Sequence, residues 1–285
     1  MEPRSVVANG LRFAYLEQGQ GPLVLLLHGF PDTAHTWDRT LDELATAGYR
    51  AVAPFMRGYH PTEIPDGGTY DMETLGRDAQ ALIEALGEPR AIVVGHDWGA
   101  GAAYAAASLA PARVRLLVTL AIPHPRAIKP TPGNVWRLRH MLWLRRRGAP
   151  DAIRARGFAY IDELWRRWSP AWRDLPARET AAVKEAFAHP GCLEAACAYY
   201  RALPLSGRLP ATFRRNITVP TVTFAGEHDL VPTRAFEKAR VCYDGPYEVV
   251  LVPGGHFMHR EHPDEFHKEL VRVLRDHHER AAAAG

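Results

Sequence analysis

The sequence contains few cysteines and little net charge for its length. Its three cysteines among 285 residues, Cys192, Cys197 and Cys242, follow no metal-ligand spacing, so we expect reduced thiols. The histidines near the C-terminus, such as His259 and His277, also lack the spacing of a metal site, and we expect neither a metal nor a cofactor. A formal charge of +3 and a pI of about 8.8 are too mild to indicate a nucleic acid partner.

The sequence also lacks a long hydrophobic run. No stretch approaches the roughly 18 consecutive apolar residues of a membrane span, and Met1–Ser5 do not begin a secretion signal. We therefore expect a soluble, cytoplasmic protein without a membrane partner. One segment, Trp136–Arg147, interleaves arginine with aromatic residues, as nucleic-acid-binding or membrane-surface helices do. A solvated helix with its apolar residues turned inward is the favoured interpretation.

Strand and helix patterns alternate along most of the chain, which predicts an α/β protein with a mostly parallel sheet covered by helices on both faces. The predicted strands are 11–17, 23–27, 50–54, 91–94, 113–120, 221–225 and 248–252, and the predicted helices of this part are 38–47, 72–86, 99–107 and 263–278. We expect 11–17 to be an edge strand that begins the sheet with a hairpin, and 281–285 to be a frayed tail. Between 123 and 216 the alternation stops and the chain becomes helical and aromatic, which indicates an inserted cap between core segments 1–122 and 217–285.

The most informative motif is Gly95-His96-Asp97-Trp98-Gly99, directly after the apolar run Ala91–Val94. Small residues on both sides of a nucleophile are typical of the sharp strand-to-helix turn that exposes a side chain above a strand end. Here a carboxylate stands where a hydrolase of this build usually has a serine. The alternative interpretation is that Asp97 is only the N-cap of the following helix.

Two further candidates follow predicted strands in the order nucleophile, acid, histidine. Asp229 comes after strand 221–225, and His256 comes after strand 248–252. A turn residue and a loop histidine that caps the last helix are the respective alternatives. Upstream, His28-Gly29-Phe30-Pro31 follows strand 23–27, where the backbone N–H of Phe30 is expected to form an oxyanion hole with that of Trp98. His28 itself is expected to hold the loop.

These motifs resemble the α/β-hydrolase family over nearly the whole chain. The aspartate nucleophile, the His28–Pro31 loop and Arg57-Gly58-Tyr59 look like its epoxide hydrolase and haloalkane dehalogenase branch, closest to the epoxide hydrolases. A carboxylate gains little by attacking an ester, whereas attack on a saturated carbon of an epoxide gives an alkyl ester of Asp97. His256, oriented by Asp229, then activates water to hydrolyse that ester, giving a vicinal diol.

The resemblance also implies ring-opening acids in the cap. Ala198-Tyr199-Tyr200-Arg201 matches the family's tyrosine motif, with Tyr200 as the acid and Tyr199 as its packed neighbour. The usual second tyrosine is missing, and His140 stands in the corresponding stretch and is expected to replace it. The implied partners are an uncharged epoxide and water, with a homodimer as a further expectation.

Two alternative functions stay open from the sequence. In a haloalkane dehalogenase, the Trp98 indole would bind the departing halide, although Phe30 lacks the side-chain donor that many such enzymes place there. In a non-catalytic binding protein, the pocket under the cap would hold a small molecule without turnover.

Overall fold

The fold is built on an eight-stranded sheet in the order β1-β2-β4-β3-β5-β6-β7-β8. The structure is a computed structural model that describes residues 1–128, 131–170, 172, 174–204 and 209–283. The strands are β1 Arg4–Ala8, β2 Leu11–Gln18, β3 Leu23–Leu27, β4 Arg50–Pro54, β5 Ala91–His96, β6 Val114–Leu120, β7 Thr221–Gly226 and β8 Tyr247–Val252. From β4 onward the neighbours pair in parallel, so the carboxyl ends of these strands meet at one edge of the sheet.

The N-terminal part of the sheet differs from the prediction. Arg4–Ala8 is itself a strand and forms the edge, so the predicted edge strand β2 lies inside the sheet. The hairpin joins β1 to β2, and β2 pairs antiparallel with β4 on its other side, rather than with β3. The alternating burial of Arg4–Ala8 is weak because this edge faces solvent, and the sequence pattern gave no signal for it.

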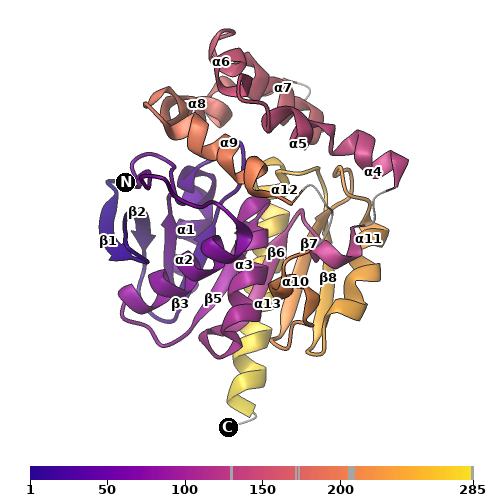
Figure 1. The fold of residues 1–285 in the computed structure, drawn as a ribbon. Coiled ribbons are helices and arrows are strands. Elements are labelled where there is room, and N and C mark those ends of the chain that lie inside the picture. The colour runs from indigo at the N-terminus through magenta and orange to yellow at the C-terminus, as the bar shows by residue number, and fades with distance from the viewer. Residues whose placement is uncertain (129–130, 171, 173, 205–208, 284–285) are drawn as a thin grey trace.

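Helices cover both faces of the sheet (Figure 1). Helices α2 and α3 pack against each other, whereas α1 and α13 contact each other on the opposite side. The helices of this core are η1 Ala34–Trp37, α1 Asp38–Thr46, α2 Met72–Ala85, α3 Trp98–Leu109, η2 Pro111–Arg113, η3 Pro125–Ala127, α10 Ala211–Arg214, α11 Thr233–Lys238, η4 Ala239–Cys242, α12 Met258–Glu261 and α13 Pro263–Ala283. Helix α13 continues through Ala283, so the predicted fraying from residue 281 is wrong for 281–283, and 284–285 lie outside the described residues.

A group of helices lies above the carboxyl end of the sheet (Figure 1). These are α4 Pro132–Arg137, α5 Arg139–Leu144, α6 Ala149–Arg154, α7 Ala159–Trp168, α8 Ala177–Ala188 and α9 Cys192–Ala202. The cap boundaries at 123 and 216 stay a prediction. In the basic segment, Leu144 is buried, but Trp136 and Leu142 are 68% and 57% exposed, so the expectation of inward-facing apolar residues is wrong for these two.

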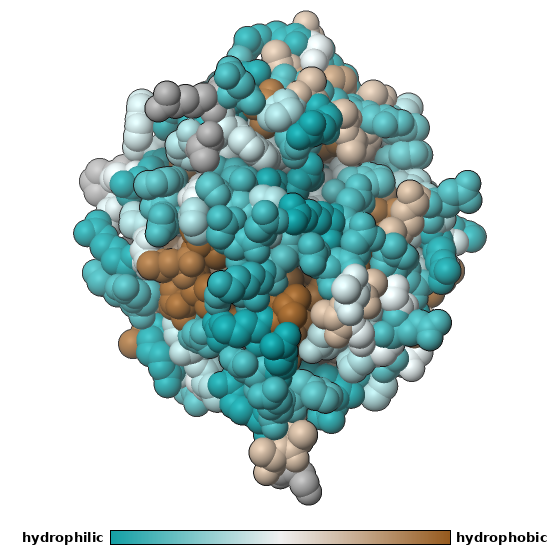
Figure 2. All heavy atoms as spheres, turned by 180° about the vertical axis from the view of Figure 1, so that it is seen from behind, coloured by the Kyte–Doolittle hydropathy of each residue, from teal (hydrophilic) through white to brown (hydrophobic). Residues whose placement is uncertain are grey.

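The distribution of polar and apolar side chains over the surface is that of an ordinary globular protein. Seen from behind, this face is mostly hydrophilic, with separate hydrophobic patches at mid-height (Figure 2). Isolated exposed side chains such as Val7 and Ile64 are ordinary for a folded chain. The three cysteines are free and buried. No described helix is both long and apolar enough to cross a bilayer.

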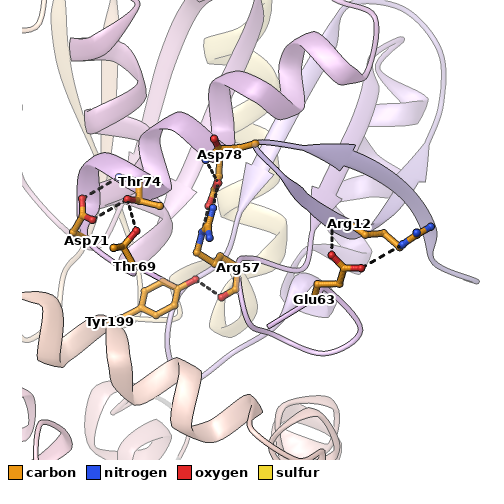
Figure 3. A network of polar contacts seen from close by, with 9 residues as sticks. Arg12, Arg57, Glu63, Thr69, Asp71, Thr74, Asp78 and Tyr199 are labelled. Carbon is orange, nitrogen blue, oxygen red and sulfur yellow. Dashed lines mark hydrogen bonds and ion pairs between the residues drawn. The ribbon is translucent and has the colours of Figure 1, made fainter. Parts of the chain in front are cut away.

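A buried ion pair fixes the loop that follows β4. The Arg57 guanidinium donates two hydrogen bonds to Asp78 on α2, at 2.7 and 2.6 Å, and both side chains are only 6% exposed. Asn9 donates a third bond to Asp78 at 2.7 Å. The backbone carbonyl of Arg57 accepts a hydrogen bond from the Tyr199 hydroxyl at 2.8 Å, so the same loop also holds α9 (Figure 3).

We predict that Asp78→Ala lowers the free energy of unfolding by about 3–5 kcal/mol, because it leaves the Arg57 guanidinium buried without a partner. The measurement is urea denaturation followed by circular dichroism. The control is Arg77→Ala next in sequence, which breaks the exposed pair with Glu73 at 2.8 Å and should cost less than about 1 kcal/mol. Equal losses in the two variants would contradict a structural role for the buried pair.

Candidate active site

Asp97 lies at the turn between β5 and α3 with a backbone that few residues adopt. Its φ and ψ are 53° and −115°, and its side chain makes no hydrogen bond to the first turn of α3. The N-cap interpretation is therefore wrong. A non-glycine residue with positive φ is strained, and such strain is concentrated at functional sites. The turn directs the carboxylate away from the helix that follows it.

Glycines next to this turn are required by close backbone contacts. A Cβ atom on Gly99 would lie 2.1 Å from the carbonyl oxygen of Leu27, and one on Gly29 would lie 2.4 Å from the Cβ of Asp97. Real Cβ atoms do not approach other atoms so closely. The two loops that follow β3 and β5 can therefore meet only because both carry glycine, and the pairing of Leu27 with Gly95 places them side by side.

The structure brings Asp97, His256 and Asp229 together from three strand ends. The Nε2 atom of His256 lies 3.5 Å from Oδ2 of Asp97, and its Nδ1 atom lies 3.2 Å from Oδ1 of Asp229. The side chains of His256 and Asp229 are 4% and 0% exposed, against 14% for Asp97. The imidazole thus lies between two carboxylates, of which Asp97 is the more accessible.

The charges in this group support one another. Burial opposes the charge on His256, but Asp229 and Asp97 outweigh it and raise the pKa of His256 to about 10. Burial likewise opposes the charge on Asp97, yet the hydrogen bond and charge of His256, with the Phe30 amide, hold the pKa of Asp97 below its ordinary value. At neutral pH the pair is an imidazolium beside a carboxylate, and Asp97 is charged.

The Phe30 loop contributes a backbone donor to the site. The Phe30 N–H donates to Oδ1 of Asp97 at 2.8 Å. His28 supports this loop, since its Nε2 accepts from the Met56 N–H at 3.0 Å and its Nδ1 lies 3.0 Å from the Gly29 carbonyl oxygen. Burial lowers the pKa of His28 to about 4, which keeps it neutral and agrees with its predicted structural role. The second expected donor, the Trp98 amide, begins α3 directly after Asp97 and stays a prediction.

A cavity of about 280 Å³ opens above Asp97 and His256. Its wall is mostly apolar, and its polar side chains are Asp97, His256, Tyr200, His140 and the Trp98 indole. The remaining lining residues are Met72, Gly101, Ile122, Pro125, Ile128, Leu138, Met141, Trp168, Leu203, Leu209, Leu230 and Val231. Such a pocket fits an uncharged organic molecule.

The structure separates the two neighbouring tyrosines of α9. Tyr200 lines the cavity, and its ring contacts those of Trp98 and Phe30 edge-on at centroid distances of 5.0 and 5.3 Å. Tyr199 instead donates to the Arg57 carbonyl and is buried outside the cavity lining. Burial, together with the charge of Asp97, raises the pKa of Tyr200 well above its ordinary value against the opposing hydrogen bond from Trp98, so its phenol keeps its proton.

His140 also reaches the cavity. Its ring lies 6.4 Å from that of Tyr200 and 4.8 Å from that of Trp168, and burial lowers its pKa to about 4. His140 is therefore neutral. Another tyrosine above the sheet, Tyr160 on α7, packs against Trp143 at 4.4 Å and is not among the cavity-lining residues.

Two contacts of the site were not predicted from the sequence. The Trp168 ring lies edge-on to that of His256 at 5.1 Å and lines the cavity. The sequence gave no sign of this, because a tryptophan in an amphipathic helix is typical of the hydrophobic core. His96 lies with Nε2 2.9 Å from the carbonyl oxygen of His256. Burial and the nearby charge of His256 lower the pKa of His96 to about 3, so it donates as a neutral imidazole. The position of His96 directly before Asp97 was the sequence feature that could have indicated this contact.

A parallel sheet with a strained nucleophile turn, followed in the chain by an acid and a histidine at later strand ends, defines an α/β-hydrolase fold. The model of the alpha/beta hydrolase fold family matches residues 22–263, and the chain belongs to this family. This confirms the predicted fold class and family.

Individual relatives are similar to the chain over almost its full length. Epoxide hydrolase A of Mycobacterium tuberculosis (strain ATCC 25618 / H37Rv) is 30% identical, covering 95% of this chain and 96% of the relative. Epoxide hydrolase 3 of Xenopus tropicalis is also 30% identical, covering 94% and 76%. The crystal structure of an epoxide hydrolase from Vigna radiata has a TM-score of 0.83 at 27% identity, covering 96% of this chain and 98% of that one.

We predict that Asp97→Asn lowers the pKa of His256 from about 10 toward its ordinary value, because one of the two carboxylates that stabilise the imidazolium loses its charge. The raised pKa means that protonation favours the folded enzyme below pH 6.5, and that this contribution is lost as the pH rises to about 10. The variant should lose the proton at lower pH, measured by NMR titration of the histidine ring protons. Glu63→Gln, on a distant surface loop, is the control, and an unchanged titration in Asp97→Asn would disprove the coupling.

Proposed function

We propose that the protein is an epoxide hydrolase that adds water to an uncharged epoxide and forms a vicinal diol through an ester of Asp97. The observation that carries this proposal is the charged, strained Asp97 below an apolar cavity that also contains a protonated phenol. The similarity to named epoxide hydrolases supports the same assignment. Catalytic residues are proposed as Asp97, His256, Asp229, Tyr200 and His140.

In the first step, an oxygen of Asp97 attacks one ring carbon of the epoxide. A carbon–oxygen bond to the enzyme forms while the ring carbon–oxygen bond breaks, and the released oxygen takes the Tyr200 proton. The raised pKa of Tyr200 keeps this proton available at neutral pH. His140, whose ring lies 6.4 Å from that of Tyr200, is the proposed second donor to this oxygen, in place of the second tyrosine that the sequence lacks. Because neutral His140 has a single N–H, this N–H must leave the Arg137 backbone to reach the ring oxygen.

The second step uses the change of charge on Asp97. Once Asp97 is an ester, it no longer stabilises the imidazolium, so His256 releases its proton to solvent more readily and becomes a base. His256 then removes a proton from water, whose oxygen attacks the ester carbonyl. The Phe30 and Trp98 amides bind the resulting oxyanion, and Asp229 stabilises the imidazolium that forms again. Collapse breaks the bond between Asp97 and the diol oxygen, which takes the water proton remaining on the Asp97 carboxyl, so the carboxylate and the diol are released. Tyr200 regains its proton from solvent, which balances the proton that His256 released.

A haloalkane dehalogenase needs side-chain N–H groups free to bind halide. The indole N–H is the one side-chain donor of Trp98, and it hydrogen-bonds the Tyr200 phenol, while Phe30 adds no side-chain donor. The geometry therefore favours the epoxide over the halide. A homodimer and a cytoplasmic location stay predictions.

The direct test is to incubate the purified protein separately with styrene oxide and with 1-chlorohexane, measuring diol by chromatography and halide by ion analysis. Diol without halide is expected. Halide without diol would instead assign Trp98 to halide binding and overturn the proposal. A protein that produces neither and forms no covalent adduct would be a binding protein.

We predict that His256→Gln forms the ester but does not hydrolyse it, because only the second step needs the base. Mass spectrometry of the intact protein should show an adduct of one epoxide, and steady-state turnover should fall by at least about 10³-fold. Asp97→Ala is the matched control, which should show neither adduct nor turnover. Turnover by Asp97→Ala, or no adduct in His256→Gln, would refute the assigned roles.

We predict that Tyr200→Phe slows ester formation by about 10²-fold or more, since the ring oxygen loses its proton donor. Stopped-flow tryptophan fluorescence during the first turnover measures this rate. Tyr199→Phe is the matched control, because its hydroxyl binds the Arg57 carbonyl outside the cavity. Equal rates in the two variants would move the acid role away from Tyr200.

A further inference from the structure

One side of the cavity is formed by a residue without a side chain. Gly101 lies in the first turn of α3, and its backbone N–H donates to the Asp97 carbonyl at 3.2 Å. Both line the cavity, together with Met72, the first residue of α2. A substituent on an epoxide held at Asp97 that extends along this wall of the cavity therefore contacts Gly101 and Met72.

The Met72 side chain fills the space that Gly101 leaves. A Cβ atom on Gly101 would lie 2.6 Å from both Cε and Sδ of Met72. The backbone at Met72 is held in place, because the preceding Asp71 caps α2 by accepting from the amides of Glu73 and Thr74, each at 3.0 Å. The thioether end, by contrast, is unbranched and rotates easily. On this wall, the recess at Gly101 has a fixed backbone, whereas the Met72 side chain that fills it can change its rotamer.

Resting on the proposed function, we infer that Gly101 and Met72 determine which epoxides the site accepts. A flat or branched substituent enters the recess at Gly101 by displacing the end of Met72, and an aromatic ring there also gains contact with the sulfur. Charged substituents are excluded, because the described lining outside the Asp97 and His256 pair offers no charged partner. The preferred substrates are uncharged epoxides with an aryl or branched group.

Gly101→Ala provides the test, since the added methyl group occupies the recess and must displace the Met72 thioether, which also lines the cavity. The ratio of kcat/KM for styrene oxide to kcat/KM for 1,2-epoxybutane should fall about tenfold or more, which is typical of one methylene in a tight pocket. Adding Met72→Ala to this variant should return the ratio to within about threefold of wild type, because the displaced group is gone.

A matched control and a second readout separate this inference from the proposed function. Gly148→Ala adds the same methyl group at the start of α6, where no atom lies within 4 Å of the new Cβ, and should leave the ratio unchanged. Binding of 1-phenyl-1,2-ethanediol and of 1,2-butanediol, followed by tryptophan fluorescence, requires no turnover. The ratio of their Kd values should change in Gly101→Ala in the same direction as the kinetic ratio.

Failures of the two hypotheses look different. A wild-type protein that hydrolyses neither epoxide overturns the proposed function, whereas the diol-binding ratio still decides whether Gly101 and Met72 select the ligand. A Gly101→Ala protein that stays folded and keeps the wild-type ratios overturns the inference alone. A Gly101→Ala, Met72→Ala double variant that does not recover the wild-type ratio also overturns the inference.

Discussion

A buried negative charge on Asp97 is the constraint on which the rest of the site depends. Burial alone would favour a neutral carboxyl, and a neutral carboxyl is a poor nucleophile. His256 and the Phe30 amide keep the charge in place. His256 lies in the loop after β8 and Phe30 in the loop after β3. The order of strands in the sheet therefore places both near the loop after β5 that carries Asp97. The glycines between these loops remove the side chains that would hold them apart.

The helices above the sheet are tied to the site by backbone contacts. The His256 N–H donates to the Trp168 carbonyl at 2.7 Å, and a Cβ on Gly255 would lie 2.2 Å from that same oxygen. The Trp165 indole donates to the Pro31 carbonyl at 2.9 Å, next to the loop that supplies the Phe30 amide. The helices above the sheet therefore contact the backbone of both the His256 loop and the Phe30 loop. A shift of these helices would move both loops, as well as the cavity wall.

The sequence predicted the elements and motifs that are written in local patterns. Buried strands, the nucleophile turn and the order of Asp97, Asp229 and His256 are local, because each follows an apolar run at a strand end. The edge strand Arg4–Ala8 carries too weak an alternation to be recognised. The contacts of Trp168 with His256, and of Met72 with Gly101, join residues far apart in the chain, and no spacing rule encodes them. Tyr200 and His140 were predicted as site residues from the resemblance to the epoxide hydrolases, and no local sequence pattern indicated them.

The replacement of serine by aspartate explains why the histidine here needs such an unusual environment. A serine nucleophile needs a neutral histidine at the start, to remove its proton. Asp97 is already ionised, so His256 is free to be protonated and to hold the nucleophile by charge before the reaction, with its pKa raised to about 10. In the proposed mechanism, ester formation removes one of the charges that raise this pKa. The bond that ends the proposed first step would therefore lower the proton affinity of His256 and prepare it to act as the base of the second.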